Sequence, residues 1–254
     1  MNAQRSPAST ELQCAIAPTG VLRASINLGN PILARRNADA RVVGVSVDLA
    51  RGLADQLGLP LALVVFDTAA RSVDAVKTGL ADIGFFAIDP LRRDGVCFSA
   101  PYLLIEGAYL VRNESPLTDN AQVDRPGTRV MVGQGSAYDL HLTRHLKAAT
   151  ILRAPSSPAV VDRFLANEAD ESDAADVAAG VKQHLQTEAT RLPGLRLLPG
   201  RFMVIQQAMG VQAGRGDRVE ATLRRCVEQA KAGGMVADAL ARHGVGGAAV
   251  APAG

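Results

Sequence analysis

The sequence predicts an α/β protein, and two observations lead to this prediction. Short apolar runs of strand length recur along the chain, at residues 21–28, 42–47, 61–66, 83–88, 129–132 and 176–181. Segments with helical spacing lie between them; in one, Val47, Ala50, Leu53 and Leu57 recur at the period of a helix. Alternation of this kind is typical of parallel strands joined by right-handed helical crossovers.

The amino-acid composition argues against several classes of function. The chain has 254 residues, enough for one large domain or two small ones, and its 48% hydrophobic and 20% charged residues are typical of a globular protein. A net charge of +2, without a basic run, argues against nucleic acid as the partner. The three cysteines lie far apart and fit neither a zinc site nor a complete disulfide framework. We therefore expect idle thiols, no cofactor and no metal.

The two ends of the chain are expected to be flexible, over residues 1–19 and 244–254. The first thirteen residues contain no apolar segment of the signal-peptide kind, and no run approaches the ~20 apolar residues that a membrane span needs. As written, the sequence predicts a cytoplasmic protein without a membrane span. If the chain is a trimmed mature form, the expected location is the periplasm.

The first elements are predicted from local signals. A strand over residues 21–28 ends at Gly29-Asn30-Pro31, and a helix comes after the 42–47 run, with Ser46 able to cap it and Gly58 able to end it. Asp48 lies in the first turn of this helix, where its negative charge interacts favourably with the helix dipole. A second helix is expected over residues 70–78.

The most informative stretch is the apolar run 83–88 together with the polar turn after it. Asp89-Pro90 ends this buried strand, because proline has no N–H for a strand ladder, and Arg92 and Arg93 come next. In open α/β sheets, ligands bind beside the carboxyl ends of the strands, and this turn lies at such an end. The guanidinium of an arginine there fits a carboxylate of the ligand. Asp89 has two open interpretations: it accepts from a cationic or hydroxyl group of a ligand, or it pairs with Arg92 or Arg93 and caps the turn.

The second half of the chain offers another anion site. After a loop at 114–127 and a strand, Ser136 is a good N-cap for a helix over residues 136–147, with Asp139 placed as in a capping box. The free N–H groups of such a helix start bind anions. His141 and His145 share a face of this helix, and we expect two solvated histidines there rather than metal ligands.

The sequence signals for the remaining helices and strands are weaker. We expect a strand at 150–154, a helix at 158–166, an acidic turn up to residue 176, apolar runs at 195–198 and 202–209, and helices at 217–230 and 235–243. Gln206 and Gln207 interrupt the second apolar run, and one of them is expected to face a hinge. A buried glutamine needs hydrogen-bond partners.

Two motifs give the chain a family resemblance. Ala87-Ile88-Asp89-Pro90-Leu91-Arg92 and Phe98-Ser99-Ala100-Pro101-Tyr102 resemble the S-I-T-x-x-R and F-S-x-P-Y motifs of the family 3 extracellular solute-binding proteins. Gly44 to Ala50 resembles the family's G-x-x-V-D-L-A segment. The resemblance implies a two-lobed, periplasmic-binding-protein-like (type II) fold. Each lobe is then a mostly parallel sheet with helices on both faces, and two hinge strands join the lobes. Lobe 1 is expected over residues 20–112 and 211–243, and lobe 2 over residues 113–210.

The resemblance also implies a binding site in the cleft between the lobes. Arg92 takes the position that holds a ligand carboxylate, and the turn at Gly135 and Ser136 takes the position that completes this grip. Ala137, Asn30 and Val181 depart from the family pattern, in which a hydroxyl, an aromatic lid and an acid that pairs with an α-ammonium are usual. The expected ligand-binding residues are Asn27, Asn30, Phe86, Ala87, Asp89, Arg92, Gly135, Ser136, Ala137, Tyr138 and Val181.

Three functions are compatible with these residues. The first is a monomeric binding protein for a small carboxylate, acting with an ABC transporter permease. The second is an enzyme on the same scaffold, similar to the dehydratases of aromatic amino-acid synthesis, with Asp89 or Glu106 as general acid. The third is a cytoplasmic sensor. The missing α-ammonium partner argues against an ordinary α-amino acid as the ligand.

Overall fold

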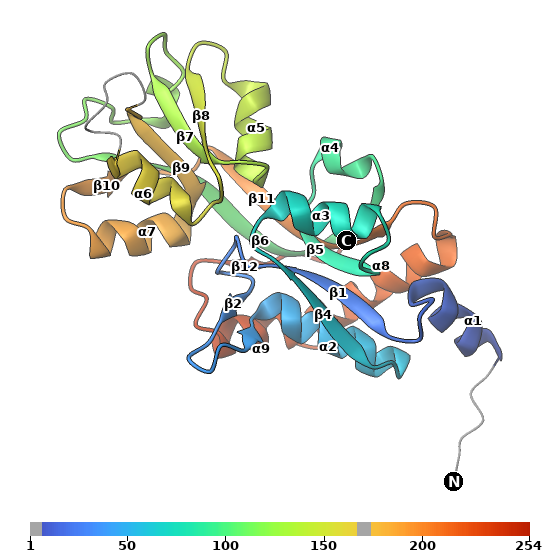
Figure 1. Cartoon of the computed structure of the whole chain (residues 1–254). Coiled ribbons are helices and arrows are strands. Elements are labelled where there is room, and N and C mark those ends of the chain that lie inside the picture. Colours follow the sequence, from blue (N-terminus) through green and yellow to red (C-terminus); the bar gives the residue numbers. More distant parts are fainter. Residues whose placement is uncertain (1–6, 167–173) are drawn as a thin grey trace.

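The computed structural model describes residues 7–166 and 174–254. Figure 1 shows two α/β lobes joined by a pair of long strands. A ten-stranded sheet runs through both lobes in the order β4-β1-β5-β11-β6-β9-β7-β8, with β10 and β12 pairing on β6. The expected α/β class and two-lobed type II architecture are thus confirmed. Of the acidic turn, residues 167–173 lie outside the described part of the chain.

Lobe 1 is built on a parallel core. β1 pairs in parallel with β4 and with β5, and β11 joins β5 antiparallel. The strands of this lobe are β1 (Leu22–Asn27), β4 (Leu61–Phe66) and β5 (Ile83–Ala87), with parts of β6 (Val96–Arg112) and β11 (Met203–Gln212). Its helices are α1 (Pro7–Ile16), α2 (Val45–Leu57), α3 (Ala69–Lys77), α4 (Pro90–Arg93), α8 (Asp217–Ala232) and α9 (Met235–Arg242).

Lobe 2 repeats this plan on a smaller scale. β7 lies between β8 and β9 in parallel, and β9 joins β6 antiparallel. Its strands are β7 (Arg129–Gly133), β8 (Thr150–Ala154), β9 (Val177–Val181) and β10 (Leu195–Leu197). Its helices are α5 (Ala137–His145), α6 (Ala159–Ala166) and α7 (Lys182–Arg191), with a short 3₁₀ turn at Asn120–Gln122. The sequence analysis missed α7 and this turn.

The lobes are connected by β6 and β11, which pair along most of their length. The sequence predicts an extended stretch at residues 98–102 and a separate strand at 107–111, but both belong to one strand of 17 residues, Val96–Arg112. Residues 107–110 of β6 already pair with β9 of lobe 2, while residues 207–211 of β11 still pair with β5 of lobe 1. The crossing therefore lies near Glu106 and Val204, several residues before the expected boundaries at 112 and 210.

The described residues at both ends of the chain form helix or strand where flexible segments were expected. In the described residues, α1 occupies Pro7–Ile16 and Ile16 is fully buried. At the other end, β12 (Ala249–Val250) pairs antiparallel with Leu103 and Leu104 of β6, and Ala251 is buried. The expectation of a disordered C-terminal tail is wrong, because this short apolar segment covers an edge of β6 whose backbone groups need partners.

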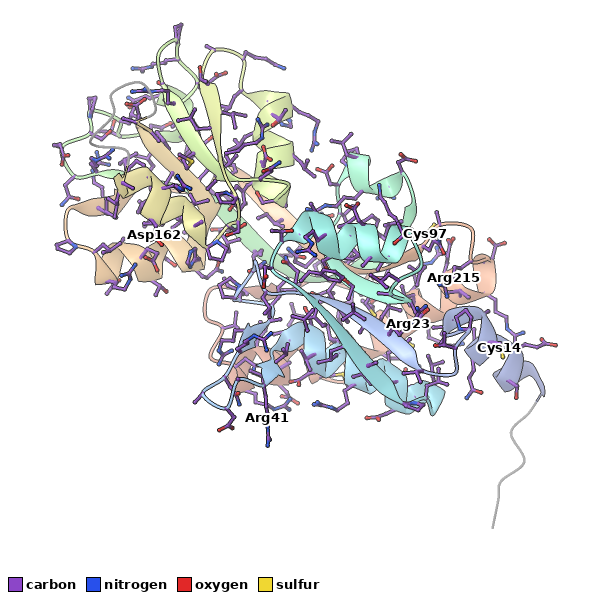
Figure 2. The ribbon with its side chains drawn as sticks, in the orientation of Figure 1. Cys14, Arg23, Arg41, Cys97, Asp162 and Arg215 are labelled. Carbon is purple, nitrogen blue, oxygen red and sulfur yellow. The ribbon has the colours of Figure 1, made fainter. Side chains whose placement is uncertain are left out.

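A buried ion cluster attaches α1 to lobe 1. Asp82 is fully buried between Arg23, at 2.7 Å, and Arg215, at 3.4 Å. Arg215 also donates to the carbonyl oxygens of Ala15 and Ile16 at the end of α1. Figure 2 shows Arg23 and Arg215 beside the end of this helix. The buried carboxylate thus has two cationic partners, one of which holds the N-terminal helix.

Two local predictions about α2 differ in outcome. Gly58 ends the helix in the left-handed conformation, with φ 61°, as predicted. The helix begins at Val45 after Gly44, however, so Ser46 is not its cap. The expected strand 42–47 shrinks to β3 (Val42–Val43), which pairs with β2 (Arg35–Arg36) outside the main sheet. The strand parallel to β4 is β1.

Candidate functional site

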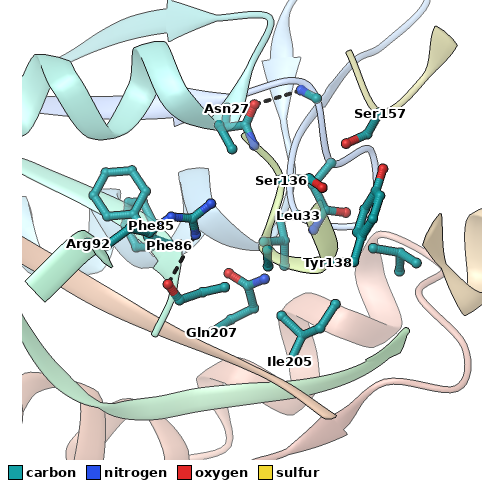
Figure 3. Close-up of a pocket in the computed structure, with 16 residues that line it drawn as sticks. Asn27, Leu33, Phe85, Phe86, Arg92, Ser136, Tyr138, Ser157, Ile205 and Gln207 are labelled. Carbon is teal, nitrogen blue, oxygen red and sulfur yellow. Dashed lines mark hydrogen bonds between the residues drawn. The ribbon is translucent and has the colours of Figure 1, made fainter. Parts of the chain in front are cut away.

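A cavity of about 40 Å³ lies between the two lobes, where β6 and β11 cross. Nine of the eleven residues expected to bind a ligand line it: Asn27, Asn30, Phe86, Ala87, Arg92, Ser136, Ala137, Tyr138 and Val181. The other lining residues are Gly29, Leu33, Ala69, Phe85, Ser157, Ile205 and Gln207. Figure 3 shows these side chains converging from both lobes. Asp89 and Gly135 lie beside the cavity rather than in its wall.

Arg92 is the central cation of this cavity. It lies on the one-turn helix α4, which Asp89 caps by accepting a hydrogen bond from the Leu91 amide at 2.9 Å. Its guanidinium donates to the carbonyl oxygen of Ala87 at 3.1 Å and to that of Gly135, across the cleft, at 3.0 Å (Figure 3 marks the first of these bonds). Burial lowers the pKa of Arg92 to about 10. The side chain remains cationic at neutral pH.

The wall from lobe 2 is formed by the start of α5. Ser136 caps this helix, accepting a hydrogen bond from the Asp139 amide at 3.0 Å, as the sequence predicts. Asp139 in turn accepts from the Gly135 amide at 2.8 Å. The Gly135 N–H therefore has a partner within the turn. The carbonyl oxygen of Gly135 instead accepts a hydrogen bond from Arg92, so the turn contacts the guanidinium through an acceptor.

Tyr138 and Ser157 complete this wall. Tyr138 is buried, and burial raises the pKa of its phenol, while hydrogen bonds to Ser157 and Ser136 oppose the rise. The hydroxyl is therefore neutral at physiological pH. Ser157, which sequence reasoning missed, comes after β8 and lies next to Tyr138 in Figure 3. Ser157 can pack this closely against β7 because residue 133 is a glycine: a Cβ atom at Gly133 would lie 2.7 Å from the Ser157 backbone.

The wall from lobe 1 carries three amide side chains. Asn27 accepts a hydrogen bond from the Gly29 amide at 2.8 Å, so its oxygen is already satisfied. The Oδ1 atom of Asn30 is buried and has no hydrogen-bond partner. Gln207 of β11 is buried in the cavity wall, which identifies it as the hinge glutamine of the predicted pair. Its signal in the sequence was a polar residue inside an apolar run.

Asp89 is held by an arginine of the other lobe. Arg144 of α5 approaches its carboxylate at 2.7 and 3.2 Å. Of the two interpretations of Asp89, the cap is therefore observed, and the salt bridge is formed with Arg144. The negative charge of Asp89 also partly offsets the lowering of the Arg92 pKa by burial. Sequence reasoning missed Arg144, because its contact with Asp89 spans 55 positions.

The second candidate acid, Glu106, lies on the hinge strand β6. It pairs with Lys182 at 2.8 Å and with Arg201 at 2.5 Å. Hydrogen bonds from Lys182 and Arg201 lower the pKa of Glu106. A carboxyl group in this position stays ionised at neutral pH and does not line the cavity.

The two histidines of α5 stack on each other, with ring centroids 4.0 Å apart. His145 is exposed, as expected, but His141 is half-buried, and burial lowers its pKa. Within residues 7–166 and 174–254, no group of three or more His, Cys, Asp and Glu side chains is arranged to hold a metal ion. No helix in the same part of the chain is long and apolar enough to span a membrane.

Two lobes, two crossing strands and a buried cation facing an interlobe cavity define a binding protein of the type II periplasmic class. The comparison of the sequence with known families agrees. Residues 22–243 match the bacterial extracellular solute-binding proteins, family 3, and the chain belongs to this family.

Solved structures share the fold. An L-cysteine solute receptor of Neisseria gonorrhoeae superposes with a TM-score of 0.77 at 22% identity, covering 91% of this chain and 92% of the receptor. The amino acid transporter substrate-binding protein AbpA of Streptococcus pneumoniae, bound to L-arginine, gives 0.75 at 16% identity, covering 90% and 96%. A reconstructed ancestral amino acid-binding protein, a precursor of cyclohexadienyl dehydratase, gives 0.74 at 19%, covering 92% and 98%.

An enzyme is also similar in sequence. Cyclohexadienyl dehydratase of Pseudomonas aeruginosa is 26% identical over 183 residues, which are 68% of this chain and 66% of the enzyme. The chain is thus similar in sequence to an enzyme and in structure to binding proteins.

Proposed function

We propose that this protein binds a small carboxylate-bearing solute between its lobes and delivers it to an ABC transporter permease without converting it. One observation carries the proposal: Arg92 is 6% exposed, and its guanidinium borders the interlobe cavity with carbonyl oxygens as its observed hydrogen-bond partners. A buried cation needs an anionic partner, and a carboxylate fits the guanidinium fork.

Binding without conversion is supported by the two carboxyl groups that could have served as general acids. Asp89 is held by Arg144 and the Leu91 amide, and Glu106 is held by Lys182 and Arg201. Neither lines the cavity. A general acid must reach the substrate, directly or through one water, and hold a transferable proton. The similar dehydratase keeps catalysis as the alternative to be tested.

The test is a thermal-shift screen against small carboxylates, followed by recovery of each hit from the protein. A ligand at 100 times its Kd should stabilise the fold by ~2.7 kcal/mol, which raises the melting temperature measurably. Recovery of an unchanged hit, identified by NMR, is the expected result. If the ligand were consumed over hours, the protein would be an enzyme and the receptor proposal would be wrong. Absence of any hit among carboxylates would contradict the role of Arg92.

The permease partner and the compartment belong to the same proposal. A solute receptor of this kind must meet its permease outside the cytoplasm, so we propose that the working protein is periplasmic. Of the two locations expected from the sequence, the proposal favours the periplasm. Cell fractionation with the native gene product checks it: recovery with cytoplasmic markers would favour a sensor.

A further inference from the structure

We infer that the solute is a short hydroxycarboxylate, an acid with a hydroxyl group and without an ammonium group. The inference rests on the proposed carboxylate site at Arg92 and specifies what the rest of the cavity recognises. Three features of the cavity carry it: its charge, its unpaired acceptor and its size.

The charge of the cavity excludes an ammonium group. Among the described lining residues, Arg92 is the one charged side chain. The adjacent carboxylate, Asp89, is outside the lining, and its oxygens accept hydrogen bonds from Arg144 and from the Leu91 amide. A zwitterion bound here would bury its ammonium beside a cation with no carboxylate to neutralise it. Burying such an unpaired charge is strongly unfavourable.

The unpaired acceptor requires a donor on the ligand. Asn30 lines the cavity, and its Oδ1 atom is buried without a hydrogen-bond partner. A simple alkyl carboxylate has no hydrogen to offer, so binding it would leave this oxygen unsatisfied. A hydroxyl group supplies one donor and remains an acceptor. The buried amide of Gln207 lies in the same cavity and can donate to it.

The cavity is also small. Its volume is about 40 Å³. Because one buried water needs about 10–15 Å³, this space holds about three water-sized groups, which favours the shortest acids. Phe85, Phe86 and Ile205 form its apolar sides (Figure 3).

The experiment compares three ligands that differ at one substituent. Lactate, propionate and alanine carry a hydroxyl, a hydrogen and an ammonium on the same carbon, and glycolate, acetate and glycine repeat the series with one carbon fewer. Isothermal titration of the full chain at pH 7 should show the hydroxy acid binding at least tenfold more tightly than both partners in one of the two series.

The outcomes separate the inference from the proposed function. Equal binding of hydroxy acid and alkyl acid would overturn the role of Asn30, while the carboxylate site would stand. Tighter binding of the amino acid would overturn the charge argument in the same way. If neither these ligands nor any carboxylate of the wider screen bound, the carboxylate site itself would fall, and this inference with it.

An isosteric variant tests the same point from the side of the protein. Asn30→Asp places a carboxylate at the unpaired acceptor, so we expect affinity for alanine to rise at least tenfold relative to lactate. Asn37→Asp is the matched control, because Asn37 lies in the exposed turn between β2 and β3. It should leave the order of affinities unchanged. An unaltered order in Asn30→Asp that still melts cooperatively would overturn the inference.

Discussion

Arg144 of α5 donates from both terminal nitrogens to the carboxylate of Asp89, at 3.2 and 2.7 Å, and so joins lobe 2 to lobe 1 directly. The Asp89 side chain is 5% exposed and that of Arg144 34%. A second bond, from Arg92 to the Gly135 carbonyl, crosses the same cleft. Two arginines from opposite lobes thus connect the lobes through contacts that involve protein atoms alone.

The Arg144–Asp89 pair should shift the balance between open and closed lobes. Arg144→Ala removes the cross-lobe partner of a buried carboxylate, so we expect a larger radius of gyration of the ligand-free protein in solution scattering. Ligand affinity should fall about tenfold, or about 1.4 kcal/mol. The control is Arg153→Ala, which breaks a similar pair with Asp139 inside lobe 2, at 3.0 Å. Equal radii in both variants would contradict the interlobe role.

Arg92→Ala should abolish carboxylate binding while the fold is retained. The variant removes the buried guanidinium and leaves the carbonyl oxygens of Ala87 and Gly135 facing the cavity, where they repel an anion. Titration calorimetry is the measurement, and circular dichroism checks the fold. Arg93→Ala, one position on, should bind normally, since Arg93 is exposed and packs over Phe98. If Arg92→Ala bound the carboxylate within tenfold of the wild-type affinity, the role of Arg92 as the carboxylate-binding residue would be refuted.

Val181→Asp should admit α-amino acids. Val181 ends β9 and lines the cavity, with 9% of its surface exposed. A carboxylate there can pair with a ligand ammonium, for which the lining of the natural cavity offers no acid. We expect alanine or a similar amino acid to bind at least tenfold more tightly than to the wild type, by titration calorimetry. The control is Val181→Asn, which adds polarity without charge and should show no gain.

Glu106 predicts a pH dependence of stability. Its pKa is lowered in the folded protein by hydrogen bonds from Lys182 and Arg201. A lowered carboxyl pKa means that the pairs stabilise the fold fully above the unfolded value of about 4.3. This stabilisation is lost as the pH falls through the lower folded value. Glu106→Gln should therefore cost about 1 kcal/mol at pH 7, and this cost should shrink as the pH falls below about 4.3.

The measurement is the difference in melting temperature between the wild type and Glu106→Gln across this pH range. Glu114→Gln makes the same change at an exposed position and serves as the control. A difference that stayed constant with pH would mean that the two cations do not stabilise the folded state through Glu106.

Removal of residues 248–254 should destabilise the protein. The truncation deletes β12, exposes the edge of β6 at Leu103 and Leu104, and removes the buried Ala251. We expect a loss of about 1 kcal/mol, or roughly 3 °C in melting temperature. A second variant, Ala251→Asp in the full chain, should act in the same direction, whereas the exposed Ala249→Ser should not. An unchanged melting temperature in both would show that the tail contributes nothing.

Features that depend on neighbouring residues could be predicted from the sequence. Asp89 caps the turn that carries Arg92, Ser136 caps α5, and Gly58 ends α2, because each needs only a side chain or a backbone conformation within a few positions. The apolar runs located most strands, and the family resemblance placed Arg92 and Ser136 on opposite walls of a cleft. Nine of the expected binding residues consequently line one cavity.

Contacts between residues far apart in the chain were settled by the tertiary fold. The Arg144–Asp89 pair spans 55 positions, and β12 meets β6 from the far end of the sequence. Gln207 and Ser157 reach the cavity because of strand register and close packing at Gly133. Such contacts leave no local periodicity, since the free energy that stabilises them comes from burial and charge pairing after the chain has folded.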